Sequence, residues 1–224
     1  MGIEYINKNI IHGNLILNSG TYDIQNNGIL FHEGCVCATK ENYYFPSKFS
    51  IRIIIENLKT HPDDSNEYSN GFILGTGTGT AYTPATYFGI HSKTKQFKFV
   101  SNNIPILLDI PDNIDLTKEI DIFITYNKGL INVYINQKNI GVINKVLTNY
   151  NTPLYIGGFP GYVYSSHGSY WGGTSGLYKC VYVYDEILEV PKRKNEKMIQ
   201  SIKNVILNNK LFQEHVAIYQ GEES

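Results

Sequence analysis

Two alternating runs of apolar and polar residues around one short glycine turn constrain the fold of this chain most. Residues 120–127 (IDIFITYN) and 130–136 (LINVYIN) alternate, and Lys128-Gly129 lies between them. Side chains of a β-strand point alternately to the two faces of a sheet, so each run gathers its apolar residues on one face. A short turn with glycine is typical of a tight hairpin. We therefore expect an antiparallel hairpin at residues 120–136.

Short apolar stretches separated by turn residues recur along most of the chain. Residues 49–56 (FSIRIIIE) are nearly continuous in apolar character and are expected to form a central strand. Residues 86–91 and 96–100 form a second expected hairpin, and residues 177–184 (LYKCVYVY) the last strand. Roughly eleven to thirteen short strands favour a β-sandwich over alternating β–α units.

The composition supports an all-β fold and argues against two kinds of partner. The chain has 18 tyrosines and 20 glycines among its 224 residues, and these residue types favour strands and tight turns. The formal net charge is −1, so no broad positive field attracts nucleic acid. The longest stretch that is apolar apart from one residue, Arg52, is at residues 51–55 and is far too short to cross a membrane. We expect neither nucleic-acid binding nor membrane insertion.

The pattern of the chain changes near residue 190. From Pro191 to residue 209 apolar residues recur at three- and four-residue steps, which is typical of an amphipathic helix. The stripe consists of Met198, Ile199, Ile202, Val205 and Ile206. We therefore expect a β domain at residues 1–190 and a C-terminal helix and tail at 191–224. The helix either packs on the β domain or joins the chain to a homo-oligomer or a larger assembly.

From residue 120 onward the order of features resembles a known superfamily. A strand with Val133-Tyr134-Ile135-Asn136 is followed by residues 153–158 (PLYIGG), 172–176 (GGTSG) and 181–185 (VYVYD). This order is similar to the second half of laminin-G-like and pentraxin-like modules of the concanavalin A-like lectin/glucanase superfamily. The resemblance covers residues 120–190 well and residues 28–100 more loosely.

The resemblance implies a two-sheet antiparallel jelly-roll sandwich, here followed by the C-terminal amphipathic helix. One departure is Gln137, which stands where the family often has glycine. Members of the superfamily are mostly sugar-binding or protein-binding modules, some bind calcium, and some are glucanases. The fold alone does not choose among these roles.

The glucanases of this superfamily carry carboxylates at alternate positions of one strand, in the order Glu-x-Asp-x-Glu. The only near match here is Glu119-Ile120-Asp121-Ile122-Phe123, which lacks the third carboxylate. We interpret Glu119 and Asp121 as a solvent-facing start of a strand, and we expect no catalytic residues.

An aromatic loop at residues 159–173 (FPGYVYSSHGSYWGG) is the best candidate for ligand binding. Sugars have polar hydroxyls and apolar C–H faces, so their sites combine flat rings with a few hydrogen-bonding groups. A second candidate loop covers residues 75–87. The predicted ligand-binding residues are Tyr82, Tyr162, Tyr164, His167, Tyr170 and Trp171. The alternative interpretation is that these rings cap the core.

Candidate metal ligands are few. The chain has three cysteines, Cys35, Cys37 and Cys180, and an odd number cannot all be paired in disulfides. His32 with the first two cysteines does not have a usual zinc spacing. Calcium is an alternative for an acidic loop that holds Asp63, Asp64 and Glu67. We expect no bound metal and no required cofactor.

The sequence therefore predicts a non-catalytic carbohydrate-binding or adhesion module that recognises a surface glycan. One alternative is a structural or assembly domain of a multimeric surface or phage-tail-type protein. A second alternative is a glycoside hydrolase. No signal peptide is visible in residues 1–17, so the location stays open between virion-associated and extracellular, as part of a larger assembly.

Overall fold

The protein is represented by a computed structural model that describes most of residues 15–191. The described ranges are 15–32, 35–60, 71–77, 85–91, 94–102, 104–158, 163–164, 169–170 and 173–191. The chain separates into two units, Met1–Val190 and Pro191–Ser224. Nearly all of the second unit, including the predicted C-terminal helix, lies outside the described residues, so that helix stays a prediction.

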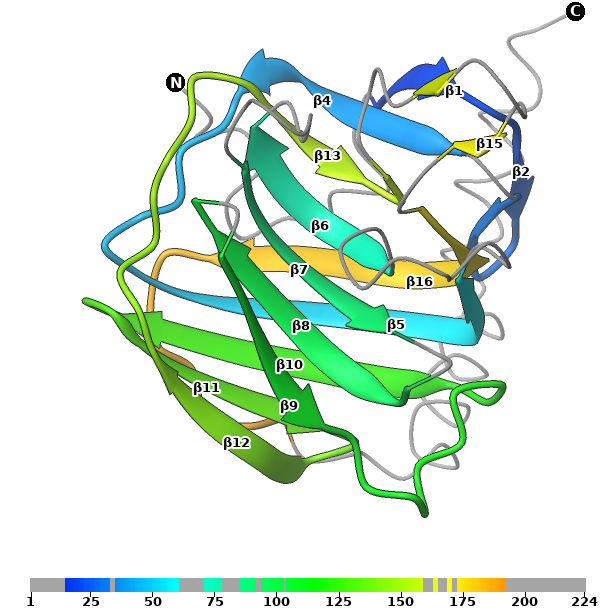
Figure 1. Ribbon diagram of the computed structural model, residues 1–224. Coiled ribbons are helices and arrows are strands. Elements are labelled where there is room, and N and C mark those ends of the chain that lie inside the picture. Colours follow the sequence, from blue (N-terminus) through cyan, green and yellow to red (C-terminus); the bar gives the residue numbers. More distant parts are fainter. Residues whose placement is uncertain are drawn as a thin grey trace, which may run out of the picture. The chain divides into compact units, whose positions relative to one another are not determined.

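The first unit contains two seven-stranded antiparallel sheets, which face each other in Figure 1. Sheet 1 consists, in spatial order, of β12 (Lys138–Asn144), β11 (Leu130–Ile135), β10 (Ile120–Asn127), β5 (Lys48–Thr60), β16 (Thr174–Tyr184), β3 (Gly28–Phe31) and β2 (Tyr22–Gln25). Sheet 2 consists of β1 (Ile16–Ser19), β4 (Val36–Asn42), β13 (Pro153–Ile156), β6 (Phe72–Gly77), β7 (Ala85–His91), β8 (Gln96–Ser101) and β9 (Ile104–Asp109). A separate short pair is formed by β14 (Val163–Tyr164) and β15 (Ser169–Tyr170).

The hairpin predicted from alternation is confirmed. β10 and β11 pair antiparallel from Ile122 opposite Ile135 to Asn127 opposite Leu130. Their two-residue turn has positive φ at Lys128 (45°) and Gly129 (99°), as tight hairpin turns require. The predicted second hairpin is also confirmed, because β7 and β8 pair antiparallel.

The core lies between the inner faces of the two sheets. β5 is central in sheet 1, between β10 and β16, and its Ile51 and Ile53 are at most 1% exposed. Sheet 2 contributes rings such as Phe88 and Phe99, whose centroids are 5.3 Å apart. Burying each such side chain contributes roughly 1.5–3 kcal/mol. Burial of the inward-facing side chains of the strands is therefore the main source of stability.

Together these features confirm the predicted all-β, two-sheet antiparallel jelly-roll sandwich. β9, which contains Pro105, lies at the edge of sheet 2, where a strand tolerates a residue without a backbone N–H. Within the described ranges there is no helix that is long and apolar enough to span a membrane.

Candidate functional site

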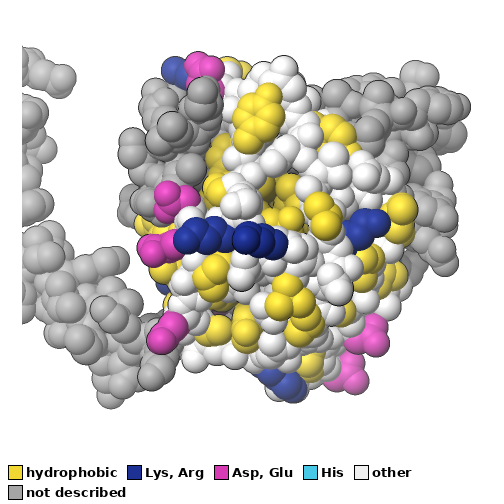
Figure 2. Space-filling model, turned by 90° about the vertical axis from the view of Figure 1, so that its left-hand side faces the viewer, with side chains coloured by type: hydrophobic (Ala, Val, Ile, Leu, Met, Phe, Trp, Pro, Cys, Tyr) yellow, Lys and Arg dark blue, Asp and Glu magenta, His cyan; other side chains and the backbone are white. Residues whose placement is uncertain are grey.

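Two connecting segments, residues 43–47 and residues 145–152, run together at one end of the sandwich. This end lies at the left of Figure 1 and faces the viewer in Figure 2. The Asn149 amide joins the segments twice: the Phe45 backbone N–H donates to Oδ1 (2.8 Å), and Nδ2 donates to the Phe45 carbonyl (2.9 Å). The Asn149 side chain thus pairs with both backbone polar groups of Phe45, as the backbone of a neighbouring strand would.

Inward-facing hydroxyl groups of sheet 2 hold the 145–152 segment in place. Thr86 Oγ1 donates to the carbonyl of Thr148 (2.7 Å), and Ser101 Oγ donates to that of Val146 (3.3 Å). Both hydroxyl-bearing residues are fully buried. Each such bond contributes about 1 kcal/mol net, and leaving its buried partner unpaired costs more. The segment is therefore rigidly positioned across the end of the sheet.

Aromatic packing anchors the 43–47 segment between the sheets. The Phe45 ring lies 5.1 Å from Phe49 of β5 and 6.1 Å from Phe88 of β7. Tyr43 is also buried, with its ring 5.2 Å from Phe45. Since side chains alternate in this extended segment, Tyr44 faces outward and is 45% exposed.

Five residues at this end form what we call the tyrosine–asparagine surface: Asn42, Tyr44, Asn102, Tyr150 and Asn151. Tyr44 Oη and Asn42 Nδ2 (2.9 Å) both donate to Asn151 Oδ1, and Tyr150 Oη donates to Asn102 Oδ1 (2.6 Å). Partial burial raises the pKa of the Tyr150 phenol, so the phenol stays protonated and keeps donating at neutral pH. Phenol rings are thus fixed beside exposed amide groups.

The surroundings of this surface are mixed in character. Figure 2 shows hydrophobic side chains spread over this end among uncharged polar atoms, with a row of Lys and Arg side chains across its middle. Within the described part of the chain, the Nδ2 groups of Asn102 and Asn151 have no hydrogen-bond partner. The end therefore offers ring faces and free amide donors to a polar ligand that also has apolar faces.

Most of the residues predicted to bind a ligand lie outside the described residues. The residues concerned are Tyr82, Tyr162, His167 and Trp171. Tyr164 and Tyr170 belong to β14 and β15, which pair antiparallel with Val163 opposite Tyr170 and Tyr164 opposite Ser169, but their side chains are not described. The aromatic loop as a binding site therefore stays a prediction.

The two predicted loops start from opposite ends of sheet 2. At one end of β6, the Gly77 N–H donates to Thr152 Oγ1 (2.8 Å), and the segment with Tyr82 follows. At the other end, the Gly157 N–H donates to the Ile73 carbonyl (3.0 Å), and the 159–172 segment follows. The Tyr82 segment therefore leaves from the end that carries the tyrosine–asparagine surface, and the 159–172 segment leaves from the other.

Sequence reasoning missed the tyrosine–asparagine surface. Its signal was present in two short stretches that combine the same residue types, Asn42-Tyr43-Tyr44 and Asn149-Tyr150-Asn151. Nothing local connects the two stretches, because more than 100 residues separate Tyr44 from Asn151. Only the closed sandwich brings them together.

The aromatic side chains described on the outer face of sheet 2 are buried. Seven apolar side chains of this face form a second, buried cluster; they are Val36, Ala38, Phe72, Ala85, Tyr87, Val100 and Tyr155. Lys98 of β8 is also buried, with its Nζ 5.8 Å from the centroid of the Tyr87 ring. Burial lowers the pKa of Lys98 to about 8. The rings described on this face are therefore buried, whereas Tyr44 at the end of the sandwich is 45% exposed.

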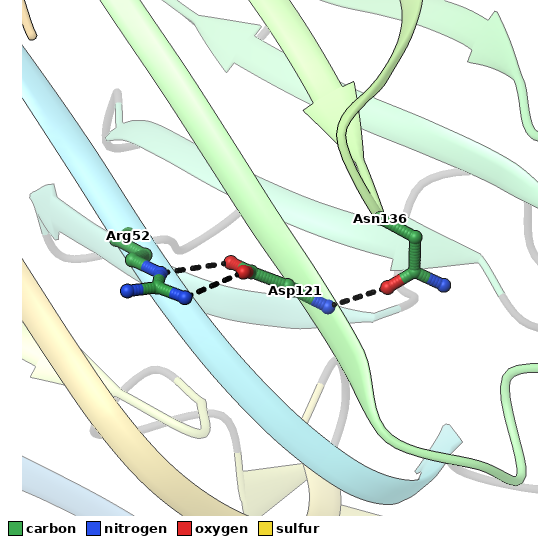
Figure 3. Close-up of polar contacts among 3 residues, drawn as sticks. All are labelled: Arg52, Asp121 and Asn136. Atoms are coloured by element: carbon green, nitrogen blue, oxygen red, sulfur yellow. Dashed lines mark hydrogen bonds and ion pairs between the residues drawn. The ribbon is translucent and has the colours of Figure 1, made fainter. Parts of the chain in front are cut away.

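On the outer face of sheet 1, Asp121 is locked into a buried ion pair (Figure 3). Arg52 donates from Nε to Oδ1 (3.1 Å) and from Nη2 to Oδ2 (2.7 Å), and the Asp121 N–H donates to Asn136 Oδ1 (3.0 Å). The Asp121 side chain is only 6% exposed. The expectation of a solvent-facing Asp121 is therefore wrong, because the neighbouring strand supplies a guanidinium that offsets the burial of the carboxylate.

Glu119, the other carboxylate of that pair, is also bound to a cation. Lys179 Nζ lies 2.8 Å from Glu119 Oε2 and 2.6 Å from Glu56 Oε2. Glycoside hydrolysis needs one carboxylic acid and one carboxylate, both free to face the bond that is broken. The arrangement of Glu119 and Asp121 instead holds each carboxylate against a basic side chain.

Metal-ligand geometry is not found in the described ranges, where no group of three or more His, Cys, Asp or Glu side chains converges. Cys35 and Cys37 are buried with their Sγ atoms 4.0 Å apart, and the thiol–thiol hydrogen bond and burial raise the pKa of Cys35. His32 Nε2 instead lies 2.7 Å from Asp23 Oδ2. The acidic loop considered for calcium, with Asp63, Asp64 and Glu67, lies outside the described residues.

No family model and no curated protein sequence matches the chain, but solved structures do. Domain 4 of AbnA, a GH43 extracellular arabinanase from Geobacillus stearothermophilus in complex with arabinotriose, matches with 12% identity, 79% coverage of this chain, 83% coverage of that chain and a TM-score of 0.51. Trypanosoma rangeli sialidase in complex with sialic acid matches with 16% identity, 77% coverage of this chain and a TM-score of 0.52.

The sialidase match covers only 28% of that enzyme's chain, so less than a third of it is similar to this protein. At such identities a structural match shows the fold alone. The matches therefore support the two-sheet β-sandwich fold and nothing finer.

Proposed function

We propose that this chain is a non-catalytic carbohydrate-binding module that binds a surface glycan through the tyrosine–asparagine surface. One observation carries the proposal: Tyr44 and Tyr150 are held by hydrogen bonds beside the exposed amides of Asn151 and Asn102. A pyranose or furanose ring presents C–H groups to an aromatic face and hydroxyls to amide donors. This end of the sandwich offers both kinds of partner on rigid segments.

Rigidity strengthens the proposal, because a preorganised site loses less conformational entropy on binding. The 145–152 segment is bonded to sheet 2 through Thr86 and Ser101 and to the 43–47 segment through Asn149. The rings and amides are therefore already in place before a ligand arrives.

A structural neighbour supports the ligand class without determining it. Domain 4 of the arabinanase AbnA was solved with arabinotriose, and its fold matches this chain over 79% of the residues. At 12% identity the similarity concerns the fold, which can serve as a scaffold for a sugar site. The side chains of this chain decide which sugar binds.

We propose a non-catalytic role because of the environments of Glu119 and Asp121. Each is paired with a basic residue, Lys179 and Arg52 respectively. Glycoside hydrolysis needs two carboxyl groups that face the scissile bond, and these ion pairs hold the two carboxylates against side chains of the protein instead. The role in adhesion and an assembly through residues 191–224 stay predictions, since nearly all of those residues lie outside the described ranges.

The proposal is tested on a glycan array with the full chain and with Tyr44→Ala and Tyr150→Ala. We expect each substitution to weaken binding about tenfold, which corresponds to a lost ring contact of roughly 1.4 kcal/mol. Tyr134→Ala, at a half-buried tyrosine on the outer face of sheet 1, is the matched control and should bind as the parent does.

Two results would contradict the proposal. If no glycan binds the folded chain, the protein is not a carbohydrate-binding module. If binding survives in Tyr44→Ala and Tyr150→Ala but is lost in Trp171→Ala, the site lies in the predicted aromatic loop and not on the tyrosine–asparagine surface.

A further inference from the structure

Three lysines from three different elements meet beside the tyrosine–asparagine surface. Lys48 begins β5, Lys128 lies in the β10–β11 turn, and Lys145 follows β12. The Lys128 N–H donates to the Ser47 carbonyl (3.1 Å), and the Lys145 N–H donates to the Gly129 carbonyl (2.7 Å). These bonds place the three residues, which we call the lysine row, at one end of sheet 1.

The lysine row borders the same two segments that carry the tyrosines. Lys48 directly follows the 43–47 segment, which contains Tyr44, and Lys145 begins the 145–152 segment, which contains Tyr150. Figure 2 shows Lys and Arg side chains in a row across the middle of this end, with Asp and Glu side chains at one end of the row. A glycan on the tyrosine–asparagine surface would therefore lie next to ammonium groups.

The ammonium groups of this row are available to a ligand. Lys48 and Lys128 are exposed, and Lys145 is half-buried. Among the described residues, none of the three has an ion pair with a carboxylate of this chain. By contrast, the cations on the outer face of sheet 1, Arg52 and Lys179, are both paired.

The backbone at Lys128 does not favour a lysine. Its φ of 45° lies in the left-handed region, where glycine and asparagine are the usual residues and other side chains cost roughly 1 kcal/mol. The turn would close at least as well with asparagine. The lysine therefore adds a charge at this position and does not improve the turn.

We infer that the glycan bound at this end is acidic, with carboxylate or sulfate groups that the lysine row contacts. This inference rests on the proposed function, because it names the ligand class of the same site. An ammonium–anion hydrogen bond is roughly twice as strong as a neutral one. An anionic sugar would thus combine ring contacts at Tyr44 and Tyr150 with charge-assisted bonds at the lysines.

The test uses calorimetry of the full chain with matched pairs of ligands. The pairs are polygalacturonate with its methyl ester, and dextran sulfate with dextran, so that carboxylate and sulfate are distinguished. We expect the acidic member of at least one pair to bind at least about tenfold more tightly at low salt, and this preference to shrink as salt is raised.

The matched variants change the same number of charges at the two ends of sheet 1. Lys48→Gln with Lys128→Asn and Lys145→Gln should abolish the acidic preference and leave binding of the neutral member unchanged. Lys59→Gln with Lys118→Gln and Lys138→Gln, at exposed lysines of the described residues, should keep the preference. Asparagine is chosen at position 128 because it tolerates positive φ.

The outcomes separate this inference from the proposed function. Equal binding of the acidic and neutral members, or a preference that survives in the lysine-row variant, overturns the acidic ligand while the glycan site remains. Binding of no ligand of either kind, by a folded chain, contradicts the proposed function, and the inference falls with it.

Discussion

The outer faces of the two sheets bury positive charge in different ways. On sheet 1, Arg52 is bonded through two nitrogens to Asp121. On sheet 2, Lys98 is 1% exposed above the Tyr87 ring, and burial lowers its pKa to about 8. The paired guanidinium shows the opposite shift, since the hydrogen bond with Asp121 raises the pKa of Arg52.

The different environments of Arg52 and Lys98 bear on where this fold can present a binding surface. A buried charge that is paired within the protein is not available to a ligand. A buried charge whose ionised form is disfavoured adds nothing to the stability of the folded protein at neutral pH. Neither of these two buried charges is therefore offered to a ligand. At the end of the sandwich the buried groups are neutral hydroxyls, such as Thr86, and the tyrosines, amides and lysines are exposed or half-buried.

We expect the largest effect when Asp121, the partner of Arg52 on sheet 1, is removed. In Asp121→Ala, Arg52 loses both bonds while it stays largely buried, and we expect the free energy of unfolding to fall by about 3–5 kcal/mol. Urea denaturation measures this change. Glu119→Ala is the control, since Lys179 keeps Glu56 as a partner, and it should cost less than about 1 kcal/mol. A similar small loss for both variants would mean that the buried pair does not stabilise sheet 1.

On sheet 2, removal of the buried cation itself should change the stability in the opposite direction. Lys98→Met removes a cation whose charged form is disfavoured, so we expect it to stabilise the protein at pH 7 by roughly 1–3 kcal/mol. The pKa of Lys98 in the folded protein, about 8, lies below the ordinary lysine value of 10.5, so the unfolded chain binds more protons between these two values. The stability contributed at Lys98 should therefore rise with pH from about 8 to 10.5.

Thermal unfolding of the parent and of Lys98→Met across this pH range tests the sign. The advantage of the variant should shrink steadily as pH rises through the window. If Lys98→Met destabilises the protein at pH 7, the contacts of Lys98 outweigh its burial, and the contrast between the two faces disappears.

The smallest effect is expected for a neutral buried group at the end of the sandwich. Thr86→Val removes the hydroxyl that bonds to the Thr148 carbonyl, and we expect a loss of about 1–2 kcal/mol with faster amide hydrogen exchange in residues 145–152. Thr125→Val is the matched control: Thr125 is a buried threonine that accepts a bond from Asn132 on the outer face of sheet 1, and its loss should leave that exchange unchanged. Equal exchange in both variants would show that sheet 2 does not hold the segment.

The fold followed closely from local pattern. The alternation at residues 120–136 predicted β10 and β11 down to their turn, and the apolar run at residues 49–56 predicted central β5. Burial was less predictable. Asp121 was expected to face solvent, and the structure pairs it with Arg52 across two neighbouring strands.

The sequence did not point to the candidate site. It pointed to the aromatic loop around Trp171, and most of the predicted ligand-binding residues lie outside the described residues, so that loop stays a prediction. Tyr44 and Asn151 gave no comparable signal, because neither stretch is long or rich enough to stand out by itself.

The strands, their hairpins and the two-sheet class follow from the amino-acid sequence, because side-chain alternation and turn chemistry act over a few neighbouring residues. Which polar groups meet depends on the tertiary structure. Contacts such as Asn149 with Phe45, 104 residues apart, depend on how the sheets close over a shared core. That closure is a property of the whole chain, and no local pattern contains it.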